Sequence, residues 1–195
     1  MIKSRIVLVA LAAVVFLMST AAHADAAPGG AEAFIRDRQA SLNRLMDAGK
    51  DAEIQTVFDS LLDYEHLAQY SLGKHAADRS DAERAEFGDV LKQLVQRAYR
   101  RNLKKTRNYK VTYDKTVPIK DGVVVSTVAR HGTDARAEPV HIEYKMHKVD
   151  AKWRIFDIVT EESSMARNYR RQFSRIIKKK GFDDLMKRLR KKLNK

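Results

Sequence analysis

The chain has 195 residues, a net charge of +13 at pH 7 and no cysteine. The lack of cysteine excludes a disulfide scaffold, a cysteine-ligated zinc site, a thiol nucleophile and a dithiol redox centre. A mature chain of about 170 residues is long enough for one domain with a sizeable core, and that core must be held together by packing.

The N-terminus has the pattern of an export signal. Lys3 and Arg5 precede an unbroken apolar run from Ile6 to Met18, and Ala22-His23-Ala24 is a small-x-small cleavage site. The run is shorter than the ~20 residues that a membrane-spanning helix needs, although an uncleaved anchor is the alternative. We expect cleavage after Ala24 and a location in the periplasm. The expected organisation is a signal peptide at 1–24, a flexible leader at 25–30 and a single domain at 31–195.

The mature chain remains strongly basic. Removing Lys3 and Arg5 lowers the net charge from +13 to +11. The basic residues concentrate in 96–110 and 167–195. Outside the cytoplasm nucleic acid is not an expected partner, so anionic lipid head groups or acidic protein surfaces are the expected ones. The alternative is that these residues form solvated helix faces.

The first half of the chain has helical periodicity. Apolar residues three and four apart predict a helix over 31–48 that ends at Gly49, and a second helix that begins at Asp51. A short helical turn follows Asp63 and runs to Leu72-Gly73. The Ser80–Glu83 segment is a capping box, and it precedes a long helix with a wide apolar stripe.

After Asn108 the period changes from 3.6 to 2, which predicts strands. Pro118 and Asp121-Gly122 indicate a turn between the first two. The first expected strand begins at Tyr109, and three more cover 123–128, 140–146 and 153–159. Two basic helices are expected after them, at 164–179 and 182–193. This order predicts an α+β fold: a curved antiparallel sheet of about four strands, with N-terminal and C-terminal helices packed on it.

No group of residues has the spacing of a catalytic or metal site. His141, Glu143 and His147 alternate on the polar face of a strand, so we expect a solvated face there and no metal. Ser163-Ser164 lacks the Gly-x-Ser-x-Gly elbow of hydrolases. We therefore expect neither an enzyme nor a cofactor; an enzyme would need an acid–base pair inside a cavity. Asp157 lies between apolar residues, so it should hydrogen-bond a turn or pair with an arginine.

Several segments, taken in order, resemble the MlaC/toluene-tolerance family. They are Asp63-Tyr64 followed by Leu72-Gly73, the helix 83–99 with its Phe, Leu and Tyr positions, the strand 152–159 with Trp153 and Asp157, and Ser164 followed by Asn168-Tyr169-Arg170 and Phe173. Two positions depart from the family pattern. His75 lies near a position where family members often carry Trp, and Glu162 replaces a Gly.

The resemblance implies a nuclear-transport-factor-like fold of the MlaC type, with a lipid cavity between the helix 87–99 and the concave sheet. It implies a carrier that holds phospholipid acyl chains and shuttles lipid between an inner-membrane ABC transporter with an MCE-domain protein and an outer-membrane lipoprotein complex. Such an auxiliary component would support outer-membrane lipid asymmetry and touch anionic membranes transiently. The alternatives are a hopanoid or other polycyclic cargo, or an adaptor with a filled core that binds no lipid.

Two groups of site residues follow from this resemblance and from the basic clusters. The residues expected to line the cavity are Phe87, Leu91, Leu94, Val95, Tyr99, Val125, Ile142, Tyr144, Trp153, Ile155, Val159 and Met165. The residues expected to dock on a membrane or partner are Arg167, Arg170, Arg171, Lys178, Lys179 and Lys180. For Tyr99, Tyr144 and Trp153 the alternative role is core packing. For Tyr169 and Arg170 it is to fix their helix to the rest of the fold.

Overall fold

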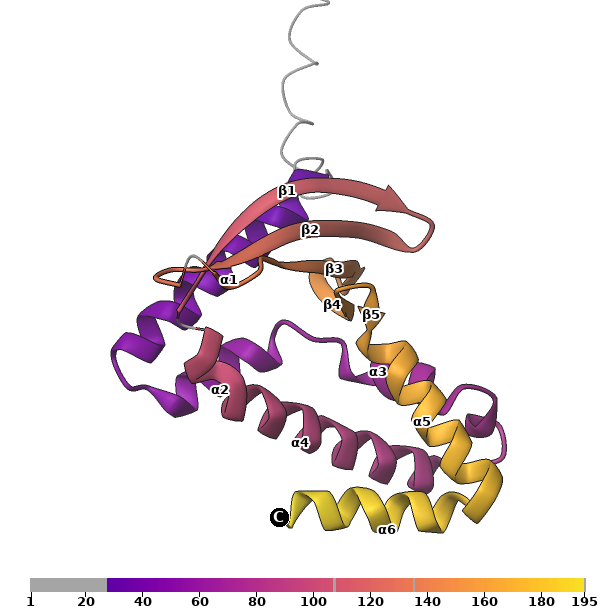
Figure 1. The fold of residues 1–195 in the computed structure, drawn as a ribbon. Coiled ribbons are helices and arrows are strands. Elements are labelled where there is room, and N and C mark those ends of the chain that lie inside the picture. Colours follow the sequence, from indigo (N-terminus) through magenta and orange to yellow (C-terminus); the bar gives the residue numbers. More distant parts are fainter. Residues whose placement is uncertain (1–27, 107, 135, 195) are drawn as a thin grey trace, which may run out of the picture.

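The computed structural model describes residues 28–106, 108–134 and 136–194, in which a curved sheet arches over a group of helices (Figure 1). The expected signal peptide and residues 25–27 of the leader lie outside the described residues. The helices are α1 (Pro28–Asp47), α2 (Asp51–Asp59), α3 (Tyr64–Leu72), the 3-10 turn η1 (Gly73–Ala76), α4 (Asp81–Thr106), α5 (Met165–Lys180) and α6 (Phe182–Leu193). The strands are β1 (Tyr109–Ile119), β2 (Gly122–His131), β3 (Val140–Val149), β4 (Lys152–Thr160) and β5 (Ser163–Ser164).

The strands form one antiparallel sheet in chain order, β1-β2-β3-β4-β5. The α+β prediction is confirmed, with β5 as a short fifth strand. Pro118, expected in a turn, lies inside β1 opposite Val123. A proline is tolerated there because β1 is at the edge of the sheet, where a missing N–H removes no bond to a further strand.

Two hairpins turn through residues with left-handed backbone. Asp150 and Ala151 join β3 to β4 with φ of 49° and 62°, and Glu161 and Glu162 join β4 to β5 with φ of 46° and 62°. Two positive φ angles in a two-residue loop are the signature of a type I′ turn, which matches the twist of paired strands. Glu162 therefore adopts a backbone that glycine would adopt more readily, at the position where family members carry Gly.

The helices begin where the sequence predicts them, apart from α1. The capping box of α4 is confirmed, since Glu83 N donates to Ser80 Oγ (3.2 Å) and Ser80 N donates to Glu83 Oε2 (2.7 Å). The backbone hydrogen bond from Ser80 lowers the pKa of the exposed Glu83 carboxyl. Helix α1 starts at Pro28, inside the expected leader, because proline suits the first turn of a helix, where the N–H has no partner.

Helix α5 is fastened to β4 by a buried carboxylate. Asp157, only 6% exposed, accepts from Ser164 Oγ (2.7 Å) and Ala166 N (3.0 Å), while Ser164 Oγ caps α5 by accepting from Arg167 N (3.1 Å). This confirms that Asp157 hydrogen-bonds a turn, as expected for a buried charge.

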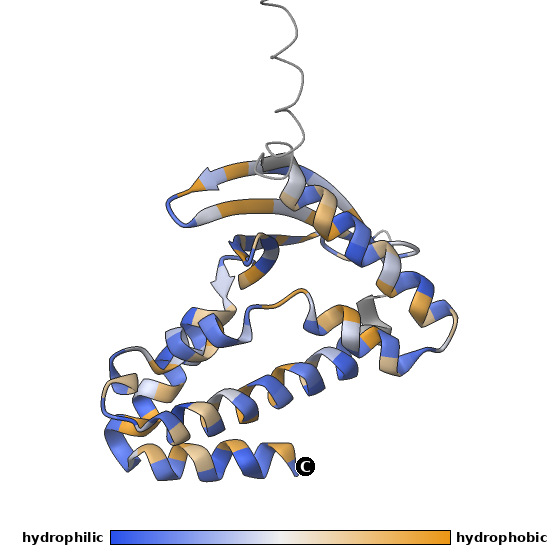
Figure 2. Cartoon of the chain, turned by 180° about the vertical axis from the view of Figure 1, so that it is seen from behind, coloured by the Kyte–Doolittle hydropathy of each residue, from blue (hydrophilic) through white to orange (hydrophobic). Residues whose placement is uncertain are grey.

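Helices α2 to α6 lie together below the sheet, while α1 runs alongside it (Figure 1). Helix α1 contacts β1 and β2, while α4 packs against α3 and α6, and α5 packs against α3, β4 and α6. Hydrophobic and hydrophilic residues alternate around the helices (Figure 2), as amphipathic packing requires. None of the described helices is both long and apolar enough to cross a membrane.

Candidate functional site

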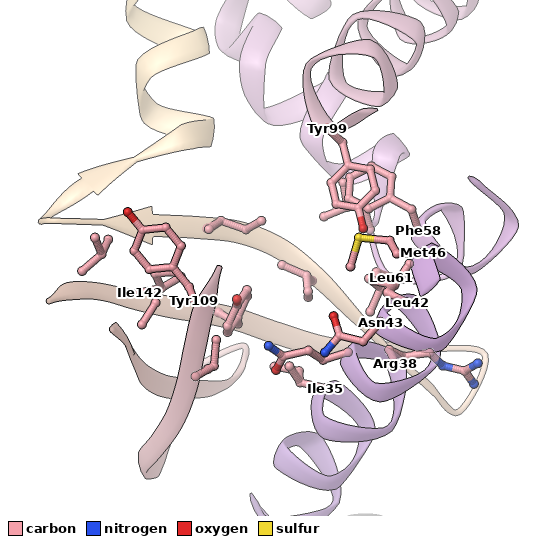
Figure 3. A pocket seen from close by; sticks show the side chains of 18 residues that line it. Ile35, Arg38, Leu42, Asn43, Met46, Phe58, Leu61, Tyr99, Tyr109 and Ile142 are labelled. Carbon is pink, nitrogen blue, oxygen red and sulfur yellow. The ribbon is translucent and has the colours of Figure 1, made fainter. Parts of the chain in front are cut away.

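A partly open pocket of about 360 Å³ lies between helix α1, helix α2 and the sheet (Figure 3). Its side chains come from α1, α2, the segment after α2, the end of α4 and strands β1 to β4. The lining residues are Ile35, Arg38, Gln39, Leu42, Asn43, Met46, Phe58, Leu61, Leu62, Tyr99, Tyr109, Val111, Ala129, Val140, Ile142, Tyr144, Ile155 and Ile158.

The sheet side of the pocket follows from strand register. Val111, Ala129 and Val140 are paired across β1, β2 and β3, so their side chains lie in one row. Tyr144 and Ile158 form a parallel row across β3 and β4. Because every second residue of a strand faces the same side, these rows build a continuous apolar wall.

The helical side of the pocket is built by α1 and by an aromatic pair. Ile35, Leu42 and Met46 repeat at helical spacing along α1 and line the pocket together. The rings of Phe58 in α2 and Tyr99 in α4 stack with centroids 3.5 Å apart and planes 13° apart. Figure 3 shows this pair beside Met46 at one end of the pocket. The pair joins α2 to α4 and closes that end.

Polar groups lie on the α1 side of the pocket. Arg38, Gln39 and Asn43 line it, and Figure 3 shows the Arg38 guanidinium turned away from the apolar side chains. Arg38 Nε is buried and makes no hydrogen bond among the described residues, but it lies 3.9 Å from Asp37 Oδ2, and the guanidinium lies 5.2 Å from the centroid of the Phe34 ring. Arg38 is thus a cation at the rim, with the Asp37 carboxylate close to its Nε.

Two tyrosines of the pocket, Tyr99 and Tyr144, have raised pKa values and keep their protons far above neutral pH. Burial raises the pKa of Tyr144, and burial together with the nearby Tyr144 raises the pKa of Tyr99. Apart from Arg38 and the tyrosines, the lining residues described are not ionisable. A site of this kind binds by removing apolar surface from water, with polar contacts confined to its rim.

The comparisons with known proteins agree with this geometry. The family model for MlaC proteins matches residues 33–191. The chain belongs to the MlaC family. Its fold is similar to the structure of a phospholipid-binding protein from Ralstonia solanacearum in complex with a phospholipid. The TM-score is 0.71 at 22% sequence identity, over 86% of this chain and 97% of that one. A search among curated proteins gave no match.

The structure divides the expected cavity residues of this MlaC-family chain into two groups. Tyr99, Ile142, Tyr144 and Ile155 line the pocket. The others lie in or against the core or are buried elsewhere: Phe87, Leu91, Leu94, Val95, Val125, Trp153, Val159 and Met165.

Helix α4 explains this division. Most of its apolar stripe packs on helices rather than on the sheet. The Phe87 ring, for instance, meets Phe173 of α5 edge-on at 5.6 Å and Phe182 of α6 at 6.4 Å. Among the described side chains of α4, Tyr99 in the C-terminal part of the helix is the one that lines the pocket. Trp153 is 8% exposed and belongs to the core, with Lys148 Nζ 5.2 Å from its ring centroid.

Sequence reasoning missed the contribution of α1 to the pocket. Ile35, Leu42 and Met46 were identifiable as one apolar helix face, but their periodicity does not say which element they pack against. The signal that could have found them is the polar trio Arg38, Gln39 and Asn43 beside this face, which is typical of a rim and not of a closed core.

The expected docking residues all lie on α5 and are exposed. Arg170 also has a structural contact, since its guanidinium carbon lies 5.0 Å from the centroid of the Tyr70 ring in α3. On the same helix the Tyr169 ring stacks on Phe173 at 5.4 Å. His75, the first of the two departures from the family pattern, links η1 to α5 through Ser174 Oγ (3.0 Å). The segment 169–174 thus helps to fasten α5 to its neighbours.

Proposed function

We propose that this protein is a periplasmic lipid carrier. In this proposal it holds phospholipid acyl chains in the pocket between α1 and the sheet and shuttles lipid between an inner-membrane MCE/ABC transporter and an outer-membrane complex. The observation that carries the proposal is the apolar pocket, lined from both layers of an MlaC-family fold. The similar Ralstonia protein, described as phospholipid-binding, supports the choice of cargo.

The energetics suit a carrier. Burying one CH₂ group is worth ~0.8 kcal/mol, so two long acyl chains are worth about 20 kcal/mol before the costs of association. Those costs reduce the net affinity, but escape of the lipid into water stays slow. The carrier must therefore release its lipid in contact with a membrane or a partner protein.

The pocket sets how such a lipid would lie. Its volume of about 360 Å³ is at the low end of the ~300–1,000 Å³ typical of small-molecule pockets, so a whole diacyl lipid requires α1 to shift away from the sheet. The acyl chains would lie between the sheet side of the pocket, which includes Ile142, and the α1 side, which includes Leu42, and the head group would stay at the rim. Arg38 is suited to a lipid phosphate there, since its guanidinium can donate two parallel hydrogen bonds.

The exposed cations of α5 suit the transfer step. Arg167, Arg171 and Lys178–Lys180 would attract an anionic membrane or an acidic partner surface, at ~1 kcal/mol for each residue close to the membrane. They lie outside the pocket. In this proposal docking and cargo binding would therefore use separate residues.

The decisive experiment is native mass spectrometry of the mature protein purified from a Gram-negative periplasm, followed by organic extraction. A stoichiometric phospholipid is expected. A hopanoid would keep the carrier function and change its cargo. A bare mass that persists after incubation with anionic vesicles would favour a lipid-free adaptor.

A substitution that fills the pocket with a larger side chain tests whether the lipid binds there. Ile142→Trp should reduce the bound lipid strongly, because the larger side chain occupies the space between β3 and α1. The matched control is Val149→Trp, on the same strand but 39% exposed and outside the pocket. Circular dichroism of both variants checks that they fold. Equal lipid content in the two folded variants would place the lipid elsewhere.

A further inference from the structure

Three possible metal ligands converge outside the pocket. Asp63 caps the start of α3, His66 lies in the first turn of that helix, and His147 lies in β3. One donor atom from each of the three lies within 4.8 Å of the other two. Asp63 Oδ2 and His147 Nε2 are 2.7 Å apart, and their side chains are 13% and 21% exposed.

The backbone holds the carboxylate in place. Asp63 Oδ1 accepts from His66 N (2.8 Å), and Asp63 N donates to Ile155 O (2.9 Å). One carboxylate oxygen is thus committed to the helix cap, while Oδ2 faces the imidazoles. Since the cap also places His66 three residues along the helix, both side chains point to the same side.

An aromatic residue supports the two imidazoles. The Phe156 ring lies 5.2 Å from the His66 ring and 4.9 Å from the His147 ring, measured between centroids. The two imidazoles meet edge-on at 5.3 Å. Packing of this kind limits the rotamers of both histidines, so little side-chain entropy remains to be lost on binding a ligand.

We propose that Asp63, His66 and His147 bind a zinc ion or a similar borderline divalent cation. Two imidazoles and one carboxylate are a known zinc donor set, which leaves the fourth tetrahedral position to water. Bonds of ~2.0–2.1 Å place tetrahedral ligand atoms about 3.4 Å apart, so small side-chain rotations would complete the site. The ion would replace the Asp63–His147 hydrogen bond and bind neutral imidazoles. Magnesium and calcium prefer oxygen ligands alone and should bind poorly.

The site lies directly behind one wall of the pocket. Ile155, which accepts from Asp63 N, also donates to Leu61 O (2.7 Å), and Leu61, Leu62 and Ile155 all line the pocket. A bound ion would tie the segment before α3 to β3 and so brace this wall. It would also stabilise the folded chain by mass action, because the site does not exist in the unfolded chain.

The test uses the mature protein without a histidine tag, stripped with a chelator and dialysed against Zn²⁺. One equivalent of zinc is expected by elemental analysis, together with a rise in melting temperature. Co²⁺ in place of Zn²⁺ should give the intense visible absorption of a tetrahedral site. If the unaltered protein binds neither ion, the proposal is wrong.

Two single variants assign the ligands. His66→Gln and His147→Gln should each weaken zinc binding by at least about tenfold, since even outer-shell partners of metal ligands are worth ~10–100-fold. His141→Gln is the control, because His141 is an exposed histidine of the same strand as His147 and lies outside the cluster. Circular dichroism without metal establishes that all three fold. Zinc binding that persists unchanged in both ligand variants would overturn the assignment.

Discussion

Gly73 and Arg170 are in direct contact, although 97 positions separate them in the sequence. A Cβ atom added to Gly73 would lie 2.8 Å from Arg170 Nε. Gly73 also ends α3 with φ of 54° and ψ of −131°, a backbone that side-chain-bearing residues rarely adopt. The guanidinium of α5 therefore lies over a position that only glycine leaves open.

Gly73→Ala should lower the free energy of unfolding by about 2–3 kcal/mol, because it combines backbone strain with displacement of Arg170. Urea denaturation measures this change. Gly49→Ala is the matched control, since Gly49 also has positive φ (67°) but nothing lies within 4 Å of an added Cβ. Its loss should be near 1 kcal/mol. Similar losses in both variants would mean that the contact with Arg170 contributes nothing.

Reversing the charge of α5 should slow lipid transfer without emptying the pocket. The variant replaces Arg167, Arg171 and Lys178–Lys180 by Glu and keeps Arg170, because Arg170 packs on Tyr70. Transfer of labelled lipid to acceptor vesicles that contain anionic lipid should fall severalfold, since attraction becomes repulsion. Lipid content by mass spectrometry should stay unchanged. An unchanged rate of lipid transfer would show that the cations of α5 do not serve docking.

Ser164→Ala should lower the free energy of unfolding by about 1–2 kcal/mol. It removes the cap of α5 and also leaves the buried Asp157 Oδ2 without its donor. Thermal denaturation measures the loss. Ser163→Ala is the control, because Ser163 is exposed and its Oγ accepts a hydrogen bond from the side chain of Asn168 (2.8 Å), which is also exposed to solvent in part. A loss as large in the control would contradict the special role of Ser164.

Glycine at the type I′ turns should stabilise the chain. Ala151→Gly and Glu162→Gly should each relieve ~1–2 kcal/mol of left-handed backbone strain in the folded state. Glycine also raises the entropy of the unfolded chain, which offsets about 0.5–1 kcal/mol of that gain in stability. The net gain should raise the melting temperature by a few degrees. Ala137→Gly, at a position without positive φ, should bring no such gain. A melting temperature that falls in both turn variants would argue against type I′ geometry.

Alkaline pH should destabilise the protein through its buried tyrosines. Burial raises the pKa of Tyr113 to about 12 and also raises the pKa of Tyr99 and Tyr144 above the ordinary value of 10.0. The folded state therefore keeps protons that the unfolded state loses, so this stability is complete below pH 10 and declines as the pH rises further. Urea denaturation at several pH values measures the decline. Tyr99→Phe should make it shallower, and an unchanged slope would exclude Tyr99 as a cause.

Much of the fold follows from local patterns. The switch from a period of 3.6 to a period of 2 after Asn108 gave the order of helices and strands correctly, and the Ser80–Glu83 box marked the start of α4. The candidate site was predicted only in part. Tyr99, Ile142, Tyr144 and Ile155 line the pocket, but α1 was not expected there.

What the sequence determines by itself is therefore the elements, their caps, their apolar faces and the distribution of charge, because each depends on residues a few positions apart. Only the tertiary structure decides which faces meet. It puts α6 and not the sheet against α4, and α1 against the sheet. It also brings His147 to Asp63 across 84 positions. An apolar face can be buried against any other apolar face, so the choice depends on the packing of the whole chain.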